Sequence, residues 1–159
     1  MNQFFALSLL AASHLALADH YFDGMDRVHL RMNRDNHFKV MQLTDLHFGE
    51  DQTSGELDHD TLHMIRSLIG KEKPDFIAIT GDIVSGQAWD RQTPRFWERY
   101  YTPLATTLTN EQVPWGIVPG FHDYEADLNS QNMLEIEAQQ RYSASLPNYY
   151  HMFDRKMHH

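Results

Sequence analysis

The chain has 159 residues, of which 42% are hydrophobic, contains no cysteine and carries a formal net charge of −9. This size suits one ordinary domain, whose stability must come from its hydrophobic core because no disulfide can form. The acidic excess argues against a nucleic-acid-binding surface, because binding to phosphate backbones needs concentrated Lys and Arg. A small phosphorylated substrate is still compatible, since bound divalent metals can reverse the field inside a site.

The first 18 residues are an apolar segment that ends in small residues before the first charged residue, Asp19. The segment is too short for an ordinary membrane span, and Ala16, Leu17 and Ala18 match an A-x-A cleavage site. We therefore expect a signal peptide over residues 1–18, cleaved after Ala18, and a secreted protein or one of the secretory or lysosomal pathway. A membrane anchor or a buried N-terminal helix is the alternative. Because no later stretch resembles a membrane span, we expect no stable membrane insertion.

The next segment predicts two strands joined by a polar turn. Residues 28–32, VHLRM, and residues 38–44, FKVMQLT, flank the turn sequence NRDN. The second strand is the better candidate for the core, and it is followed directly by Asp45, Leu46 and His47. Residues 48–59 are mostly polar and contain two glycines, which predicts a loop at the carboxyl end of this strand.

A helix is predicted from its cap, Asp60, to about Lys73, and Pro74 ends it. Residues 76–80 then form an apolar, uncharged run, typical of a strand buried on both faces of a parallel sheet. The resulting strand-helix-strand unit implies a parallel pair with a right-handed crossover. The predicted core side of the helix repeats at helical spacing: Leu62, Ile65, Leu68 and Ile69.

A second helix is predicted to begin with Thr93 as cap and Pro94 as first residue, with a kink or restart at Pro103. The short apolar run 113–118 predicts a third strand, and residues 129–142 predict a weakly periodic helix with Leu134 and Ala138 on its core side. The core stripe of the second helix is expected to be Trp97, Tyr101, Leu104 and Leu108.

Chemistry-bearing side chains follow each of the three core strands. In a parallel sheet the carboxyl ends of the strands share one edge, where ligands bind, so these side chains can converge. Carboxylates and imidazoles suit divalent Zn, Mn or Fe, and two such ions can clamp the attacking and leaving oxygens of a phosphoryl displacement. Any one of the groups alone could be an ordinary turn or loop residue. The residues are Asp45 and His47, then Asp82, then His122 and Asp123.

These motifs resemble those of the calcineurin-like metallophosphoesterases. The family's D-x-H corresponds to Asp45-Leu46-His47, its G-D to Gly81-Asp82, and its G-N-H-[DE] to Gly120-Phe121-His122-Asp123. The flanking sequence looks most like the purple-acid-phosphatase-like branch of plants and fungi. The resemblance runs from about residue 38 to residue 142 and covers the N-terminal half of the family's domain.

The resemblance implies an α/β fold: a β-α-β-α-β half of the metallophosphoesterase two-layer sandwich with flanking helices. Residues 19–159 would then be the N-terminal part of a calcineurin-like phosphoesterase domain, and the fold would be incomplete. The implied activity is that of a phosphatase, a metal-dependent phosphoesterase that hydrolyses phosphate esters by means of metal-activated water. A phosphorylated substrate is the implied partner.

The resemblance also assigns roles to residues. Asp45 and His47 would bind the first metal ion, and Asp82 would bridge two ions, Fe, Mn or Zn, in a complete enzyme. His122 would contact the phosphate or protonate the leaving oxygen, and Asp123 would orient the His122 imidazole.

The purple enzymes use a tyrosine ligand at the position of Ser85, so we expect no tyrosinate ligand here. Two departures from the family pattern count against activity. Phe121 stands where the family has a metal-binding Asn, and its ring cannot coordinate a hard cation. The family's later motifs, a lone His and G-H-x-H, have no counterpart in this sequence. We therefore expect one metal ion or none here. The alternative function is a catalytically silent binding or assembly module.

The third strand is expected to leave its outer edge and one sheet face uncovered. An open strand edge invites pairing, so we expect self-association or a partner unless the residues after Ser143 fold back over the edge. A monodisperse monomer in light scattering with protected amides in this strand would contradict that expectation.

Overall fold

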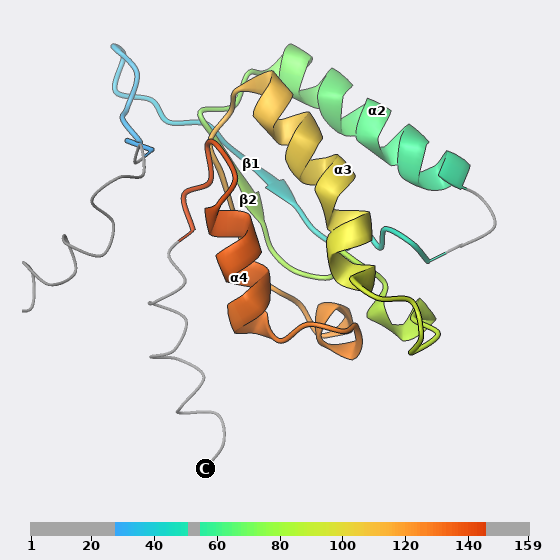
Figure 1. The fold of residues 1–159 in the computed structure, drawn as a ribbon. Coiled ribbons are helices and arrows are strands. Elements are labelled where there is room, and N and C mark those ends of the chain that lie inside the picture. The colour runs from blue at the N-terminus through green and yellow to red at the C-terminus, as the bar shows by residue number, and fades with distance from the viewer. Residues whose placement is uncertain (1–27, 51–54, 146–159) are drawn as a thin grey trace, which may run out of the picture.

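The computed structural model describes residues 28–50 and 55–145, which form a parallel sheet packed against helices (Figure 1). The strands are β1 (Val40–Leu43), β2 (Phe76–Ile79) and β3 (Trp115–Ile117), in the order β1-β2-β3. Both pairs are parallel, and β2 is central. The predicted α/β fold with a parallel sheet is confirmed. The predicted signal peptide lies outside the described residues.

Three helices accompany the strands: α2 (Gly55–Glu72), α3 (Phe96–Glu111) and α4 (Ser130–Ala138). Two short 3₁₀ helices, η1 (Gly86–Ala88) and η2 (His122–Glu125), follow β2 and β3. In Figure 1, α3 lies between α2 and α4, and it packs against both. None of the described helices is long and apolar enough to cross a membrane.

The core is built from alternate residues of the strands and one side of each helix. Ile77, Ile79 and Trp115 are fully buried and belong to the same hydrophobic cluster as the buried side chains of α2, α3 and α4. At the alternate positions, which face the other way, Val40 is 52% exposed and Val118 is 58% exposed. The described helices therefore cover one face of the sheet more completely than the other.

The start of the described chain differs from the prediction. Residues 28–32 form no strand and pair with none of the described strands. The predicted polar turn is present, and the Asn33 side-chain oxygen holds it by accepting hydrogen bonds from the backbone N–H groups of Asp35 and His37.

Helix α2 begins at Gly55, five residues before the predicted cap Asp60. Glu56 and Asp58 lie in its first turn, where the helix dipole favours negative charge. The Asp58 carboxylate also accepts the backbone N–H of Gly49, at 3.0 Å. Two of the four predicted core residues, Ile65 and Ile69, are buried, whereas Leu68 is 37% exposed and the prediction for it was wrong.

Helix α3 begins at Phe96 rather than at Pro94, because its cap comes from a distant part of the chain. The Asp127 carboxylate accepts the backbone N–H groups of Phe96 and Trp97, at 2.9 and 3.0 Å. The helix runs without a break through Pro103, so the expected restart is absent. Pro103 lies on the exposed side, where water can satisfy the backbone carbonyl that proline leaves without a donor. The predicted stripe is confirmed, since these residues are fully buried: Trp97, Tyr101, Leu104 and Leu108.

Helix α4 ends at Ala138, before the predicted residue 142, and the chain then returns to the sheet. The backbone N–H of Trp115 donates to the carbonyl of Tyr142, at 3.1 Å, and the N–H of Ala144 donates to the carbonyl of Trp115, at 2.7 Å. This pairing covers the outer edge of β3 at Trp115. The expected open edge is therefore partly closed by the chain itself, and self-association or a partner at the rest of the edge stays a prediction.

A buried carboxylate in α4 was not predicted. Glu137 is 0% exposed, and burial raises its pKa from the ordinary value of 4.5 to about 7, although the hydroxyls of Ser145 and Ser143 oppose the rise. The charge of Glu137 in turn adds to the effect of burial on Tyr101, whose pKa is raised well above its ordinary value. Helix α4 thus places an acid that titrates near neutrality inside the core.

We predict that Glu137 makes stability depend on pH. Since its folded pKa, about 7, exceeds its unfolded value of 4.5, the folded state favours the protonated form, and stability falls as pH rises through this window. Above this pH window, ionisation of the buried Glu137 lowers the free energy of unfolding by an amount on the order of 3 kcal/mol. Glu137→Gln should therefore be more stable than the wild type at pH 8 and should lose this advantage near pH 4.5 in denaturant unfolding. Glu135→Gln, at an exposed position of the same helix, is the control. An identical pH dependence in the wild type and Glu137→Gln would contradict the prediction.

Candidate metal centre

The parallel pairing of β1 and β2 continues into the loops beyond their carboxyl ends. The backbone N–H of Asp45 donates to the carbonyl of Gly81, at 3.1 Å, and the N–H of His47 donates to that of Asp82, also at 3.1 Å. Phe48 and Val84 form a further parallel bridge. The two loops are thus joined residue by residue, and this brings the D-x-H motif beside the G-D motif.

The predicted convergence of Asp45, His47 and Asp82 is present in the structure. Each residue offers one ligand atom, and these atoms all lie within 4.8 Å of one another. Asp45 is exposed, whereas His47 and Asp82 are half-buried. Two carboxylates and one imidazole fit a divalent transition metal, and a catalytic metal with three protein ligands keeps a position for water or substrate. The donor set therefore fits one ion.

All three candidate ligands have a left-handed backbone. The φ angles are 53° for Asp45, 50° for His47 and 50° for Asp82. A residue other than glycine pays on the order of 1–3 kcal/mol for such a conformation, and it persists only where the surrounding structure enforces it. The ligands are therefore placed by the fold and not by local preference.

A serine fixes the His47 ring. The Ser85 hydroxyl donates to the His47 carbonyl at 3.3 Å, so its oxygen is left to accept from His47 Nδ1, 3.0 Å away. With the proton on Nδ1, this arrangement would leave Nε2 as the nitrogen that binds a metal. The sequence indicated only that Ser85 is not a tyrosine ligand. Only the structure shows that Ser85 is fully buried and that its hydroxyl contacts the His47 ring.

The loop after β3 holds Asp82 from the other side. The His122 backbone N–H donates to Asp82 Oδ1, at 2.9 Å. A side chain at Gly120 would place its Cβ 2.2 Å from the same oxygen, so only glycine fits there. The glycine of the G-x-H motif therefore allows the third loop to approach the candidate ligand.

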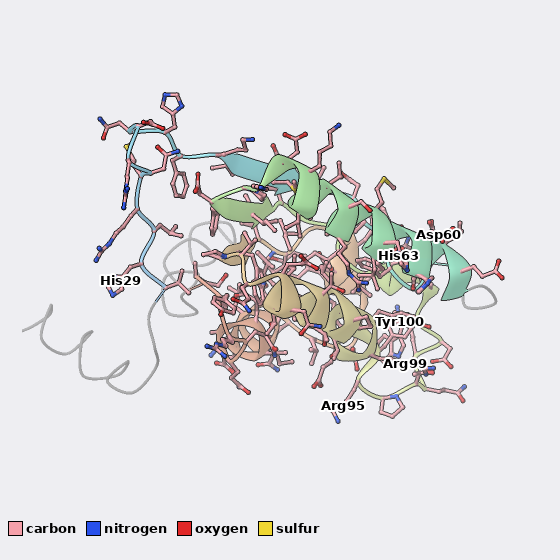
Figure 2. The ribbon with its side chains drawn as sticks, turned by 90° about the horizontal axis from the view of Figure 1, so that it is seen from above. His29, Asp60, His63, Arg95, Arg99 and Tyr100 are labelled. Atoms are coloured by element: carbon pink, nitrogen blue, oxygen red, sulfur yellow. The ribbon has the colours of Figure 1, made fainter. Side chains whose placement is uncertain are left out.

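The first loop is packed against α3 through another glycine. Gly49 has a φ of 79°, and a Cβ there would lie 2.7 Å from the Tyr100 ring. Figure 2 labels Tyr100 on this helix, next to Arg99. The approach leaves no space for a side chain at position 49, in the loop that follows the D-x-H motif.

Asp123 does not contact the ring that it was expected to orient. It is 0% exposed, and both of its oxygens are occupied by donors from three segments of the chain. Its role is to join these segments, which is a correction of the sequence-based assignment. The donors are the backbone N–H groups of Ile83 at 3.2 Å, Val84 at 2.9 Å and Gly120 at 2.8 Å, and the indole N–H of Trp97 at 3.0 Å.

The carboxylate beside His122 is instead that of Glu125. His122 Nδ1 lies 2.7 Å from Glu125 Oε2. This hydrogen bond is the main cause that raises the pKa of His122, burial opposes it, and the charges of Asp82, Glu125 and Asp123 add to it. Glu125 was not predicted from the sequence, although its spacing of three residues from His122 indicates a pair on one helical turn.

His122 itself lies beside the candidate ligands. Its ring centroid is 5.3 Å from that of His47. Phe121, at the position of the family's Asn, is 73% exposed and packs its ring against the edge of the His122 ring, at a centroid distance of 5.4 Å. The site thus has an imidazole in place for acid-base chemistry, and an apolar ring where a second metal would need an oxygen.

A parallel sheet with candidate carboxylate and imidazole ligands at its carboxyl edge, and a second histidine beside them, is the arrangement expected of an α/β protein of the metal-dependent phosphoesterase class. The model of the calcineurin-like phosphoesterase family matches residues 38–157, and the chain belongs to this family.

Relatives of known name support this assignment. The chain is 28% identical to Probable inactive purple acid phosphatase 14 of Arabidopsis thaliana, over 92% of this chain and 38% of that protein. It is 29% identical to Probable inactive purple acid phosphatase 28 of the same plant, over 75% of this chain and 32% of that protein. It is 25% identical to Phosphatase DCR2 of Saccharomyces cerevisiae, over 72% of this chain and 21% of that protein. The chain therefore spans well under half the length of these curated relatives.

We predict that Asp123 is needed for stability more than for proton transfer. Asp123→Asn replaces an oxygen that accepts N–H donors by an NH₂ group, which leaves buried donors without a partner. The free energy of unfolding should fall by about 3 kcal/mol. Asp127→Asn, which alters a partly exposed helix cap, is a matched control with an expected loss of about 1 kcal/mol. Denaturant unfolding measures both, and an Asp123→Asn variant as stable as the wild type would contradict the prediction.

Proposed function

We propose that this chain binds a divalent metal ion through Asp45, His47 and Asp82 and acts as a metal-dependent phosphoesterase that hydrolyses phosphate esters. The observation that carries the proposal is the approach of their ligand atoms to within 4.8 Å of one another. When bound, the metal lowers the pKa of a coordinated water and polarises a phosphoryl oxygen. Family membership and the position of His122 support the same reaction class.

The chain's own side chains have distinct parts in this proposal. Ser85 holds the proton on His47 Nδ1, so that Nε2 is free as a ligand. Asp82, kept in place by the His122 backbone N–H, is the carboxylate that would bridge two ions in a complete enzyme. His122 contacts the phosphate or gives a proton to the leaving oxygen. Fe, Mn and Zn all suit the donor set.

We predict that Asp45→Asn lowers metal affinity by more than about tenfold, because an amide replaces a charged ligand. Asp45 is exposed, so the fold should be unaffected. Metal analysis after dialysis against Zn or Mn, with aryl phosphate hydrolysis, measures the effect. Asp60→Asn is the matched control, because Asp60 is an exposed aspartate on α2 (Figure 2) that does not belong to the group of three ligands. Wild-type protein with neither bound metal nor turnover would count against the proposal.

A catalytically silent binding or assembly module is the second candidate. It is favoured by Phe121, whose exposed ring stands where the family has a metal-binding Asn. The two Arabidopsis relatives named above also carry the word inactive in their names. Phe121→Asn separates the candidates, since it restores an amide oxygen at a position that contributes little to the core. In a phosphoesterase, this variant should raise the bound metal from one toward two ions and increase turnover. A variant with no gain in either measurement supports the silent module.

Secretion is also part of the proposal, and it rests on the apolar segment and the A-x-A site at residues 1–18. Expression of the full chain in a eukaryotic secretory host tests it. We expect a product in the medium whose N-terminal sequence begins at Asp19. A product retained in the cell with its first 18 residues intact would contradict this part of the proposal.

A further inference from the structure

Glu125 and His122 are the two ends of the short helix η2. In a 3₁₀ helix the side chains of residues i and i+3 lie one above the other, so this spacing places the carboxylate directly beside the imidazole. The observed distance of 2.7 Å between Nδ1 and Oε2 is that of a strong charge-assisted hydrogen bond. The local helix type, and not a distant contact, creates this pair.

Other nearby carboxylates are engaged elsewhere. Asp123 directs both of its oxygens to buried N–H donors. Asp82 Oδ1 contacts His122 only through the backbone N–H. Glu125 is therefore the residue whose carboxylate is hydrogen-bonded to the His122 ring.

The turn that displays the pair is firmly held. Its backbone is closed by hydrogen bonds from Tyr124 to Phe121 and from Ala126 to Asp123, both at 3.2 Å. A Cβ at Gly86 would lie 2.2 Å from the His122 carbonyl, so η1 packs directly on η2. A side chain pair on such a turn loses little conformational entropy when it orients a ring.

We propose that Glu125 is a positioning residue that holds His122 in the Nδ1–H tautomer and leaves Nε2 as the nitrogen that meets the phosphate ester. The proposal rests on the proposed phosphoesterase function. A carboxylate can only accept a hydrogen bond, so the proton stays on Nδ1. In the imidazolium form, Nε2 gives its proton to the leaving oxygen as the ester bond breaks, and the ring returns to the neutral Nδ1–H form.

The test uses the full chain labelled with ¹⁵N-histidine, with the His122 signals assigned by their loss in His122→Gln. The ring ¹⁵N shifts of the wild type should report the Nδ1–H tautomer. Glu125→Ala should shift His122 toward the Nε2–H form, whereas Glu125→Gln, whose amide oxygen still accepts, should restore Nδ1–H. Glu135→Ala removes an equivalent exposed carboxylate on α4 and should leave the His122 signals unchanged. An Nε2–H wild type, or no response to Glu125→Ala, overturns the proposal.

A kinetic measurement separates this inference from the proposed function. With metal-loaded protein and an aryl phosphate, Glu125→Ala should lower kcat by about 10–100-fold with little change in KM or metal affinity. Glu125→Gln should recover part of the rate. A wild type without turnover refutes the proposed activity, and the tautomer measurement then decides the positioning role by itself. An active wild type whose kcat is unaffected by Glu125→Ala overturns the role in the reaction.

Discussion

The buried carboxylate of Asp123 is the constraint on which the site depends. It joins the loop after β2, through Ile83 and Val84, to the loop after β3, through Gly120, and to the first turn of α3, through Trp97. A carboxyl group without solvent is costly unless its oxygens accept hydrogen bonds, and here four N–H donors supply them. The same four bonds fix how far apart the two loops lie, and so where Asp82 and His122 stand.

The candidate ligands make use of this rigidity. The left-handed conformations of Asp45, His47 and Asp82 would be unstable in flexible loops, where the chain would relax to ordinary dihedral angles. In this protein the ladder between the loops and the close approach of Gly120 remove that freedom. The packing of the fold therefore enforces the strained backbone conformations. The candidate ligands are thus preorganised before a metal binds.

The sequence was sufficient for the features that depend on local pattern. The parallel sheet was predicted from the uncharged run 76–80, and the core side of α3 from its hydrophobic stripe. The convergence of Asp45, His47 and Asp82 was predicted from the motifs that follow the strands. Patterns could not predict contacts made across the fold. The cap of α3 comes from Asp127, about 30 residues later in the chain, and the burial of Glu137 follows from how α4 packs on α3. The assignment of Asp123 to His122 was wrong because adjacency in sequence says nothing about which oxygens the core has already engaged.

The continued pairing of the β1 and β2 loops has a consequence for how the edge of the sheet behaves. Strand β1 is an outer strand, hydrogen-bonded to β2 alone among the described strands. A metal held jointly by Asp45 and His47 on one loop and Asp82 on the next would fasten this outer strand to the central one at its carboxyl end. Metal binding would then act as a stabilising link between neighbouring strands. Amide exchange in residues 40–48 would consequently report occupancy of the site, whether or not the protein turns over a substrate.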